Sequence, residues 1–198
     1  MGDNRTNLAA LIGSRICHDL ISPIGAIANG LELLELTGAA EGPEFDLIAD
    51  SAGNAGARIR FFRIAYGAAG DQSMGRTEIC SVLNDVYRGT RVQALWGPLE
   101  PHPRAEVRLA FLALQCCETA LPYGGQVQIR VEDDHWMVCG KGEMVSIDQN
   151  LWSKLDTADT AADLTPAVVQ FALLPEVAAD IGRRVSVTHS DTEVTLRF

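Results

Sequence analysis

The sequence predicts an α+β protein in which an N-terminal helical hairpin precedes a sandwich of helices packed on one face of a β-sheet. Two observations predict this class. Apolar residues recur at helical spacing in the first part of the chain, and helical and strand patterns alternate in the rest. A stretch rich in glycine, alanine and polar residues at 67–75 separates the two parts. We therefore expect two domains, residues 1–70 and residues 76–198.

Two helices with heptad spacing are expected in the first domain. The first covers about 4–37, with apolar positions four and three residues apart at Leu20, Ile24, Ile27, Leu31 and Leu34. Glycines and a proline within 37–43 end this helix and begin the next one. The second helix covers about 44–69 and repeats the spacing at Ile48, Ala52, Ala55, Ile59, Phe62 and Tyr66.

A single hairpin cannot bury both apolar stripes well. The simplest way to enclose them is a second copy of the chain, which would complete a four-helix bundle about a twofold axis. We therefore expect a homodimer. Small residues of the second helix would allow close helix approach: Ala52, Gly53, Ala55, Gly56 and Ala57.

The second domain is expected to alternate helices with strands. Helices are predicted at about 79–88, 103–120 and 166–181, and strands at about 93–96, 126–132, 135–139, 184–189 and 193–198. The last helix contains Pro175, where we expect a kink, and Gly182 is expected to stop it.

Composition and charge exclude several classes of protein. A hydrophobic share of 47% with 21% charged residues is typical of a folded chain. The net charge of −10 opposes binding to nucleic acid or anionic membranes, so neither is an expected partner. Five cysteines without a C-x-x-C pair fit neither a disulfide framework nor a zinc site, and the first residues do not resemble an export signal. These features predict a protein of the reducing cytoplasm.

The strongest local signal is His18 in the first helix. At about 100° per residue it lies on a stripe roughly opposite the apolar one, together with Ser22, Gly25 and Asn29. We therefore expect the imidazole to face solvent, where its neutral form can act as a nucleophile. Asp19 could hydrogen-bond the ring and hold its tautomer. The alternatives are a surface histidine without a role and a solvated helix acid.

Pro23 interrupts the same helix shortly after His18. A proline inside a helix removes a hydrogen-bond donor and costs up to about 3 kcal/mol. A local bend beside a reactive residue would explain its presence.

The run from His18 to Ile24, H-D-L-I-S-P-I, resembles the phosphoacceptor box H-[ED]-L-x-x-P-[LI] of histidine-kinase dimerisation domains at every position. With the hairpin and the chain length, it is similar to the alphaproteobacterial histidine phosphotransferases of the ChpT type. The resemblance implies a dimeric four-helix bundle that carries a degenerate, histidine-kinase-like (Bergerat-type) ATP-binding domain.

Against the kinase pattern, the second domain lacks the residues that hold a nucleotide. In the segment 108–125, Cys116, or Gln115 in a shifted register, stands where a kinase has its metal-binding asparagine, and a thiol is a poor ligand for Mg²⁺. Val138 stands where the adenine-reading aspartate belongs, and the glycine-rich lid is missing at 163–166. We therefore expect no ATP binding and neither a bound metal nor a cofactor.

The resemblance further implies a phosphorelay enzyme. His18 would take a phosphoryl group from the receiver aspartate of a CckA-like hybrid histidine kinase and pass it to CtrA-like response regulators in cell-cycle control, with Asp19 assisting. Mg²⁺ would arrive with the partner receiver. We expect receivers to dock on a stripe beside His18, flanked by Arg58 or Arg63 of the second helix: Arg15, Ile21, Ser22, Gly25 and Asn29.

Two rival functions stay open at this point. A divergent histidine kinase would still bind ATP through residues that do not resemble the kinase pattern, and saturable ATP binding would favour it. A non-catalytic dimerisation scaffold would never carry phosphate on His18.

Overall fold

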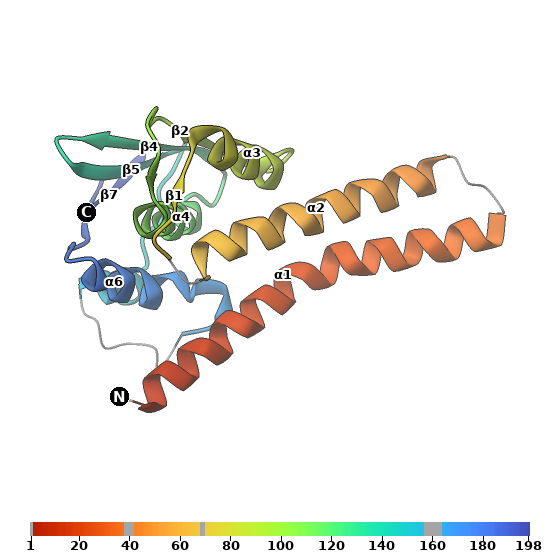
Figure 1. Ribbon diagram of the computed structural model, residues 1–198, viewed down its shortest axis with the longest axis horizontal. Helices are drawn as coiled ribbons and strands as arrows, with labels where there is room; N and C mark the ends of the chain where they lie inside the picture. Colours follow the sequence, from red (N-terminus) through yellow and green to blue (C-terminus); the bar gives the residue numbers. More distant parts are fainter. Residues whose placement is uncertain (1, 38–41, 68–69, 157–163) are drawn as a thin grey trace.

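The computed structural model describes residues 2–37, 42–67, 70–156 and 164–198. Two long helices form an arm that projects from a globular part, which contains the C-terminus (Figure 1). The arm is the predicted hairpin, with α1 over Gly2–Thr37 and α2 over Pro43–Ala65 lying side by side. The predicted α+β class is confirmed.

The arm depends on a close approach of its two helices at Gly30. A Cβ atom on this buried residue would lie 2.3 Å from Cγ1 of Ile48, so only a hydrogen atom fits there. The close approach expected at the small residues of the second helix belongs to the dimer, which one chain does not test. Within one chain, Gly53 and Gly56 have no heavy atom within 4 Å of such a Cβ. The glycine that the hairpin needs is therefore on α1.

The second helix is shorter than predicted. It ends at Ala65, and the N–H of Tyr66 donates to the carbonyl of Phe62 at 2.8 Å to close the last turn. The expected end at Ala69 lies outside the described residues. At its start, Pro43 occupies a first-turn position where a missing N–H leaves no hydrogen bond unmade.

The globular part contains a five-stranded sheet of order β2-β4-β5-β7-β6. Only β2 and β4 are parallel neighbours, and the other pairs are antiparallel. The strands are β2 (Val92–Trp96), β4 (Gly125–Glu132), β5 (His135–Lys141), β6 (Ser186–His189) and β7 (Glu193–Arg197). All five were predicted within a few residues.

Helix α4 (Arg104–Thr119) lies at the centre of the core. Its residues 109–117 are all buried, because one side packs on β4, β5 and β7 while α6 (Gln170–Asp180) covers the other. From the sheet, Val127, Ile129 and Val138 face this core with no exposed surface. Helix α3 (Arg76–Tyr87) packs on β2 and on α2 and so joins the arm to the globular part.

Several short elements were not predicted. Within the expected linker, β1 (Ser73–Met74) pairs with β3 (His102–Pro103), and Met74 is buried. The helix predicted from 166 begins as a 3₁₀ turn, η3 (Pro166–Val168), before α6 continues through Pro175. Helix α5 (Gln149–Trp152) and the turn η1 (Ser153–Asp156) precede it. Elements of two to four residues are too short for a periodic pattern to show them.

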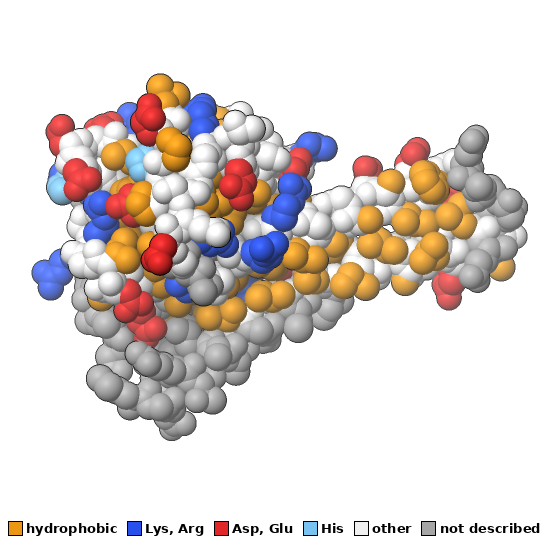
Figure 2. All heavy atoms as spheres, viewed as in Figure 1, with side chains coloured by type: hydrophobic (Ala, Val, Ile, Leu, Met, Phe, Trp, Pro, Cys, Tyr) orange, Lys and Arg blue, Asp and Glu red, His pale blue; other side chains and the backbone are white. Residues whose placement is uncertain are grey.

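Large apolar side chains are exposed along the arm. Ile24 and Leu31 of α1 are 56% and 51% exposed, and Phe45 and Ile59 of α2 are 51% and 47% exposed. Figure 2 shows hydrophobic side chains along this arm. No helix of the described part of the chain is long and apolar enough to span a membrane.

Candidate functional site

The imidazole of His18 projects from α1 into solvent. Its side chain is 82% exposed, and Ser22, Gly25 and Asn29 of the same stripe are exposed as well. The structure thus has the outward orientation that the helical spacing predicts. The side chain of Ile21, which was expected on the docking stripe, lies outside the described residues.

Asp19 holds one side of the imidazole ring. Its Oδ1 lies 3.0 Å from Nδ1 of His18, and only 10% of its side chain is exposed. A carboxylate can only accept hydrogen bonds, so this contact assigns the ring proton to Nδ1. Nε2, the nitrogen farther from the backbone, then keeps its lone pair free and directed to solvent.

Two arginines hold the other oxygen of the carboxylate. Nε of Arg15 donates to Oδ2 of Asp19 at 2.8 Å, and Nη1 of Arg58 lies 3.8 Å from the same oxygen. Arg58 is itself oriented by α2, because its Nε donates to Oδ1 of Asn54 at 2.9 Å. Asp19 is therefore hydrogen-bonded by Arg15 of α1 and ion-paired with Arg58 of α2, whereas the side chain of His18 beside it is exposed.

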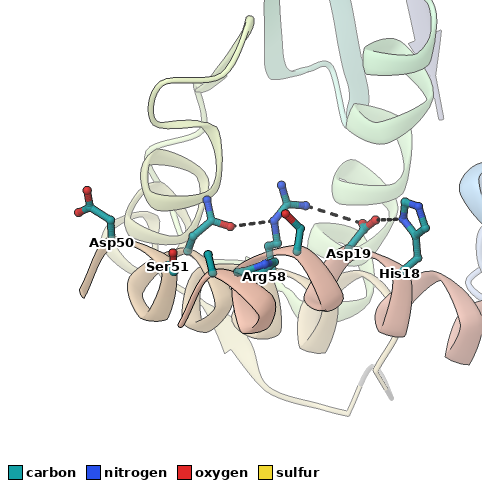
Figure 3. A pocket seen from close by; sticks show the side chains of 9 residues that line it. His18, Asp19, Asp50, Ser51 and Arg58 are labelled. Carbon is teal, nitrogen blue, oxygen red and sulfur yellow. Dashed lines mark hydrogen bonds and ion pairs between the residues drawn. The ribbon is translucent and has the colours of Figure 1, made fainter. Parts of the chain in front are cut away.

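These residues surround an open groove of about 430 Å³ between α1 and α2 (Figure 3). From α2, the groove is lined by Asp50, Ser51, Asn54 and Arg58. From α1, it includes Pro23, which has no N–H to donate to the carbonyl of Asp19 one turn earlier.

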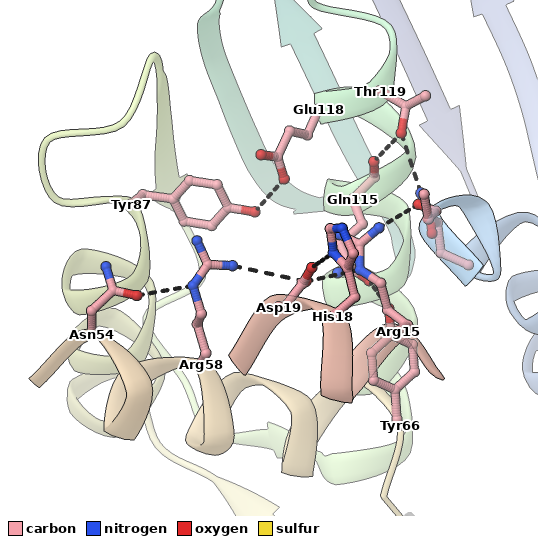
Figure 4. A network of polar contacts seen from close by, with 12 residues as sticks. Arg15, His18, Asp19, Asn54, Arg58, Tyr66, Tyr87, Gln115, Glu118 and Thr119 are labelled. Atoms are coloured by element: carbon pink, nitrogen blue, oxygen red, sulfur yellow. Dashed lines mark hydrogen bonds and ion pairs between the residues drawn. The ribbon is translucent and has the colours of Figure 1, made fainter. Parts of the chain in front are cut away.

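Arg15 differs from its expected place on the docking stripe. Its side chain is only 20% exposed, and besides Asp19 its Nη1 donates to the carbonyl of Ala167 in the globular part (Figure 4). Arg63 also lies apart from His18, in a small groove with Arg60 and Arg104. Of the two second-helix arginines considered, the structure places Arg58 at the site.

A polar network continues from the site into the globular part (Figure 4). The hydroxyl of Tyr66 donates to Oε1 of Gln115 at 2.9 Å, and that of Tyr87 donates to Oε2 of Glu118 at 3.1 Å. Burial raises the pKa of Tyr66 to about 12, while the nearby charge of Arg15 acts to lower it. Burial also raises the pKa of Tyr87 well above its ordinary value. Both phenols are therefore neutral hydrogen-bond donors near neutral pH.

The residues in the kinase nucleotide positions are buried in the core. Cys116 and Val138 have no exposed surface, and Gln115 is bonded to Tyr66. Burial raises the pKa values of the Cys116 and Cys117 thiols well above the ordinary value, so both stay protonated. Among the described residues, no three His, Cys, Asp or Glu side chains converge as a metal site would require.

Sequence reasoning identified the α1 side of the site but not most of the α2 side. Ser51, Asn54 and Arg58 follow one another at spacings of three and four, so they share one face of α2. That spacing is a detectable signal. It does not by itself show that the face lies opposite His18, because this depends on how the hairpin packs.

Three comparisons with known proteins agree with one another. Residues 76–193 match the family described as "Histidine phosphotransferase C-terminal domain". "Protein phosphotransferase ChpT" of Brucella abortus (strain 2308) is 40% identical over 148 residues, which cover 71% of this chain and 70% of that protein. A solved structure of a bacterial phosphotransferase superposes with a TM-score of 0.80 at 33% identity, covering 97% of this chain and 95% of the other.

Proposed function

The chain belongs to the family of histidine phosphotransferases, and from this premise we propose that His18 is the residue that carries the phosphoryl group. The observation that carries the proposal is the environment of the ring, which is exposed on one side and hydrogen-bonded on the other. The imidazole is 82% exposed, and Asp19 holds its Nδ1 at 3.0 Å, which leaves Nε2 free to react.

The proposed reaction begins with an aspartyl phosphate on a receiver domain. The Nε2 lone pair of His18 attacks phosphorus, an N–P bond forms, and the bond from phosphorus to the receiver's aspartyl oxygen breaks, which releases a carboxylate. The ring keeps its Nδ1 proton and gains positive charge, which the carboxylate of Asp19 stabilises. Transfer to a second receiver reverses these bond changes.

We propose that the transfer uses no cofactor of this chain. Asp19 is already engaged by His18 and two arginines, so it offers little to a cation. Mg²⁺ held by a partner receiver would neutralise charge on the phosphoryl oxygens. The role of this chain is then to position Nε2 and to leave room around it.

We propose further that the globular domain does not bind ATP. The kinase ligand positions Cys116 and Val138 face the core, and Nε2 of Gln170 donates to Oγ1 of Thr119 at 3.2 Å, which ties α6 to α4.

The partners we propose are receiver domains, first that of a hybrid histidine kinase and then those of response regulators, CckA-like and CtrA-like in kind. They would dock over Ser22, Gly25 and Asn29, whose small side chains allow close approach to His18. We also propose a cytoplasmic location, supported by free thiols at the four cysteines whose side chains are described: Cys80, Cys116, Cys117 and Cys139.

We propose a homodimer from the exposed apolar columns of the arm. Ile24 and Leu31 are seven residues apart on α1, and Phe45 and Ile59 lie fourteen apart on α2, so each pair keeps the heptad register. Side chains of this size at heptad positions are buried in a bundle rather than left in water. A second hairpin would cover both columns without covering His18.

Incubation with a receiver labelled by ³²P on its aspartate tests the transfer. We expect acid-labile, base-stable label on the protein in the absence of ATP, and none on His18→Gln. Because His18 is exposed, the free energy of unfolding of His18→Gln, measured in urea, should lie within about 0.5 kcal/mol of the wild-type value. A loss of labelling in this variant would then not result from a loss of folding. Equal labelling of His18→Gln would refute the assignment.

The same purified protein distinguishes a phosphotransferase from the two rival functions, a divergent histidine kinase and a dimerisation scaffold. Incubation with γ-³²P-ATP alone should leave the chain unlabelled, and titration calorimetry with ATP should show no saturable binding. A divergent kinase would bind or use ATP. A scaffold would fail to take label from any of a panel of receivers.

A further inference from the structure

We propose that Arg15 is a positioning residue through which the globular domain holds His18 ready for transfer. One guanidinium joins the carboxylate of Asp19 to the backbone carbonyl of Ala167, and Asp19 in turn holds the ring of His18. The inference rests on the proposed role of His18. Under this inference the globular part positions the His18 ring through Arg15, a role that does not need a nucleotide.

The two oxygens of Asp19 serve different partners. Oδ1 accepts from Nδ1 of His18, and Oδ2 accepts from Nε of Arg15. Because a carboxylate is planar, holding Oδ2 in place also sets the direction of Oδ1. Arg58 cannot replace this hold, since its nearest nitrogen is 3.8 Å from Oδ2, beyond hydrogen-bond distance. Loss of Arg15 should therefore let the carboxylate turn away from the ring.

The second bond of Arg15 fixes the guanidinium itself. Ala167 lies in η3, which packs against α1 and leads into α6, and α6 packs on the central helix α4. The carbonyl of Ala167 thus has a position set by the core of the globular domain. With only 20% of its side chain exposed, Arg15 is confined between the two domains rather than mobile on the surface.

Among the described residues, the other arginine contacts between the arm and the globular part do not reach Asp19. Nη2 of Arg60 bonds Oδ2 of Asp85 at 2.8 Å, and Arg104 and Arg108 donate to backbone carbonyls at the end of the arm. Within the described part of the chain, Arg15 is the side chain that bonds both Asp19 and the globular domain. Arg60→Ala is therefore a matched control: it removes an arginine contact between the domains but leaves Asp19 alone.

The tautomer of His18 is the direct measurement. In protein labelled with ¹⁵N-histidine, at a pH of about 8.5 where an ordinary imidazole is neutral, we expect wild type to hold the proton on Nδ1. Arg15→Ala should move a measurable fraction to Nε2, whereas Arg60→Ala should give the wild-type spectrum. Arg15→Lys should lie between them, because one ammonium group cannot bond Asp19 and Ala167 in the same geometry. The ¹⁵N signals of the His18 ring are assigned by their absence from the spectrum of His18→Gln.

Reactivity is the second measurement, made with potassium phosphoramidate as a small donor that needs no receiver. Arg15→Ala should slow phosphorylation of His18 by about tenfold, the equivalent of one charge-assisted hydrogen bond. Arg60→Ala should react at the wild-type rate.

The inference is overturned if Arg15→Ala keeps the wild-type tautomer and rate, or if Arg60→Ala loses both to the same extent. Should Arg15→Ala fail to fold, Arg15→Lys decides by the same two measurements. Neither measurement uses a receiver. If phosphorylated receivers never label the wild type while the tautomer still depends on Arg15, the proposed function fails and the positioning role stands.

Discussion

At the scale of single residues, the imidazole of His18 and the charged side chains that hold it lie on different sides of α1. His18 and Asp19 are neighbours on one helix, about 100° apart around its axis, so one faces solvent while the other faces α2 and the globular domain. The side chains that hold the ring can then be buried and charged without covering the imidazole. A half-buried acid between two arginines also loses less to solvent screening than an exposed one.

Asp19→Asn tests this separation. The amide keeps the shape of the side chain but removes the charge that stabilises the ring during transfer, so we expect phosphorylation of His18 to slow by about ten- to a hundredfold. Asp50→Asn changes an exposed acid of the same groove and should slow it less than threefold, roughly the scale of a surface charge. Initial rates with a phosphorylated receiver decide; equal losses in both variants would contradict the role of Asp19.

Tyr66 should make the fold sensitive to alkali. Burial raises its pKa from 10.0 to about 12, so the folded state binds the phenolic proton more tightly than the unfolded chain. This stabilisation is complete below pH 10 and is lost as pH rises from 10 to about 12, amounting to roughly 2 to 3 kcal/mol.

The variant Tyr66→Phe isolates that loss. Near pH 8 it should be less stable than wild type by about 1 kcal/mol, because the hydrogen bond to Gln115 is gone. Near pH 12 Tyr66→Phe should be more stable than wild type, since phenylalanine has no proton to lose. Urea unfolding at both pH values measures the two differences, and a constant difference would show that Tyr66 does not titrate as expected.

At the scale of the elements, the hairpin depends on one contact between its helices. Gly30→Ala places a methyl group where Cγ1 of Ile48 and the carbonyl of Glu44 already lie, so the helices must move apart. We expect a loss of about 1 to 3 kcal/mol in the free energy of unfolding. Gly53→Ala adds the same methyl group in open space on α2 and should gain up to about 1 kcal/mol from helix propensity.

Urea unfolding of both variants at one protein concentration makes the comparison, because association would otherwise shift the apparent stability. A Gly30→Ala protein as stable as Gly53→Ala would show that the helices are not in close contact at this point.

The elements that could be predicted are those with a long, regular pattern. The heptads of α1 and α2 and the alternating strands β4 and β5 extend over enough residues to show their period. The pair β1–β3 could not be predicted, because two-residue strands have no period and their partners are far apart in sequence. Gly30 was also missed, since a glycine in a helix does not reveal what lies opposite.

At the scale of the whole molecule, the arm carries most of the large exposed apolar side chains of the described residues. Its exposed apolar columns run along both helices, while the core of the globular part also includes Phe61, Phe62 and Ile64 at the end of α2. The proposed dimer would therefore form through the arm.

Ile24→Glu tests this arrangement. In a twofold bundle the charge would be buried on both chains, and an unpaired buried carboxylate costs several kcal/mol, so we expect the dimer dissociation constant to rise by more than about a hundredfold. Leu99→Glu changes an exposed apolar residue of the globular domain, 76% exposed, and should leave it unchanged. Sedimentation equilibrium measures both; a monomeric wild type would refute the dimer.

The sequence by itself determined the candidate residue, His18, and the side of the helix on which it lies. Residues on one helix have fixed angular relations, so spacing alone places His18 on the face of α1 opposite the apolar stripe, and its imidazole is exposed. The box around His18 likewise identified the family before any contact was known.

Only the tertiary structure decided what surrounds Asp19. Arg15 was expected to face a partner, yet it bonds Ala167, a residue 152 positions away along the chain. Arg58 reaches the same carboxylate from the second helix. Such contacts depend on how α1, α2 and η3 pack against one another, and packing of distant segments is set by the shapes of the buried surfaces rather than by any local period.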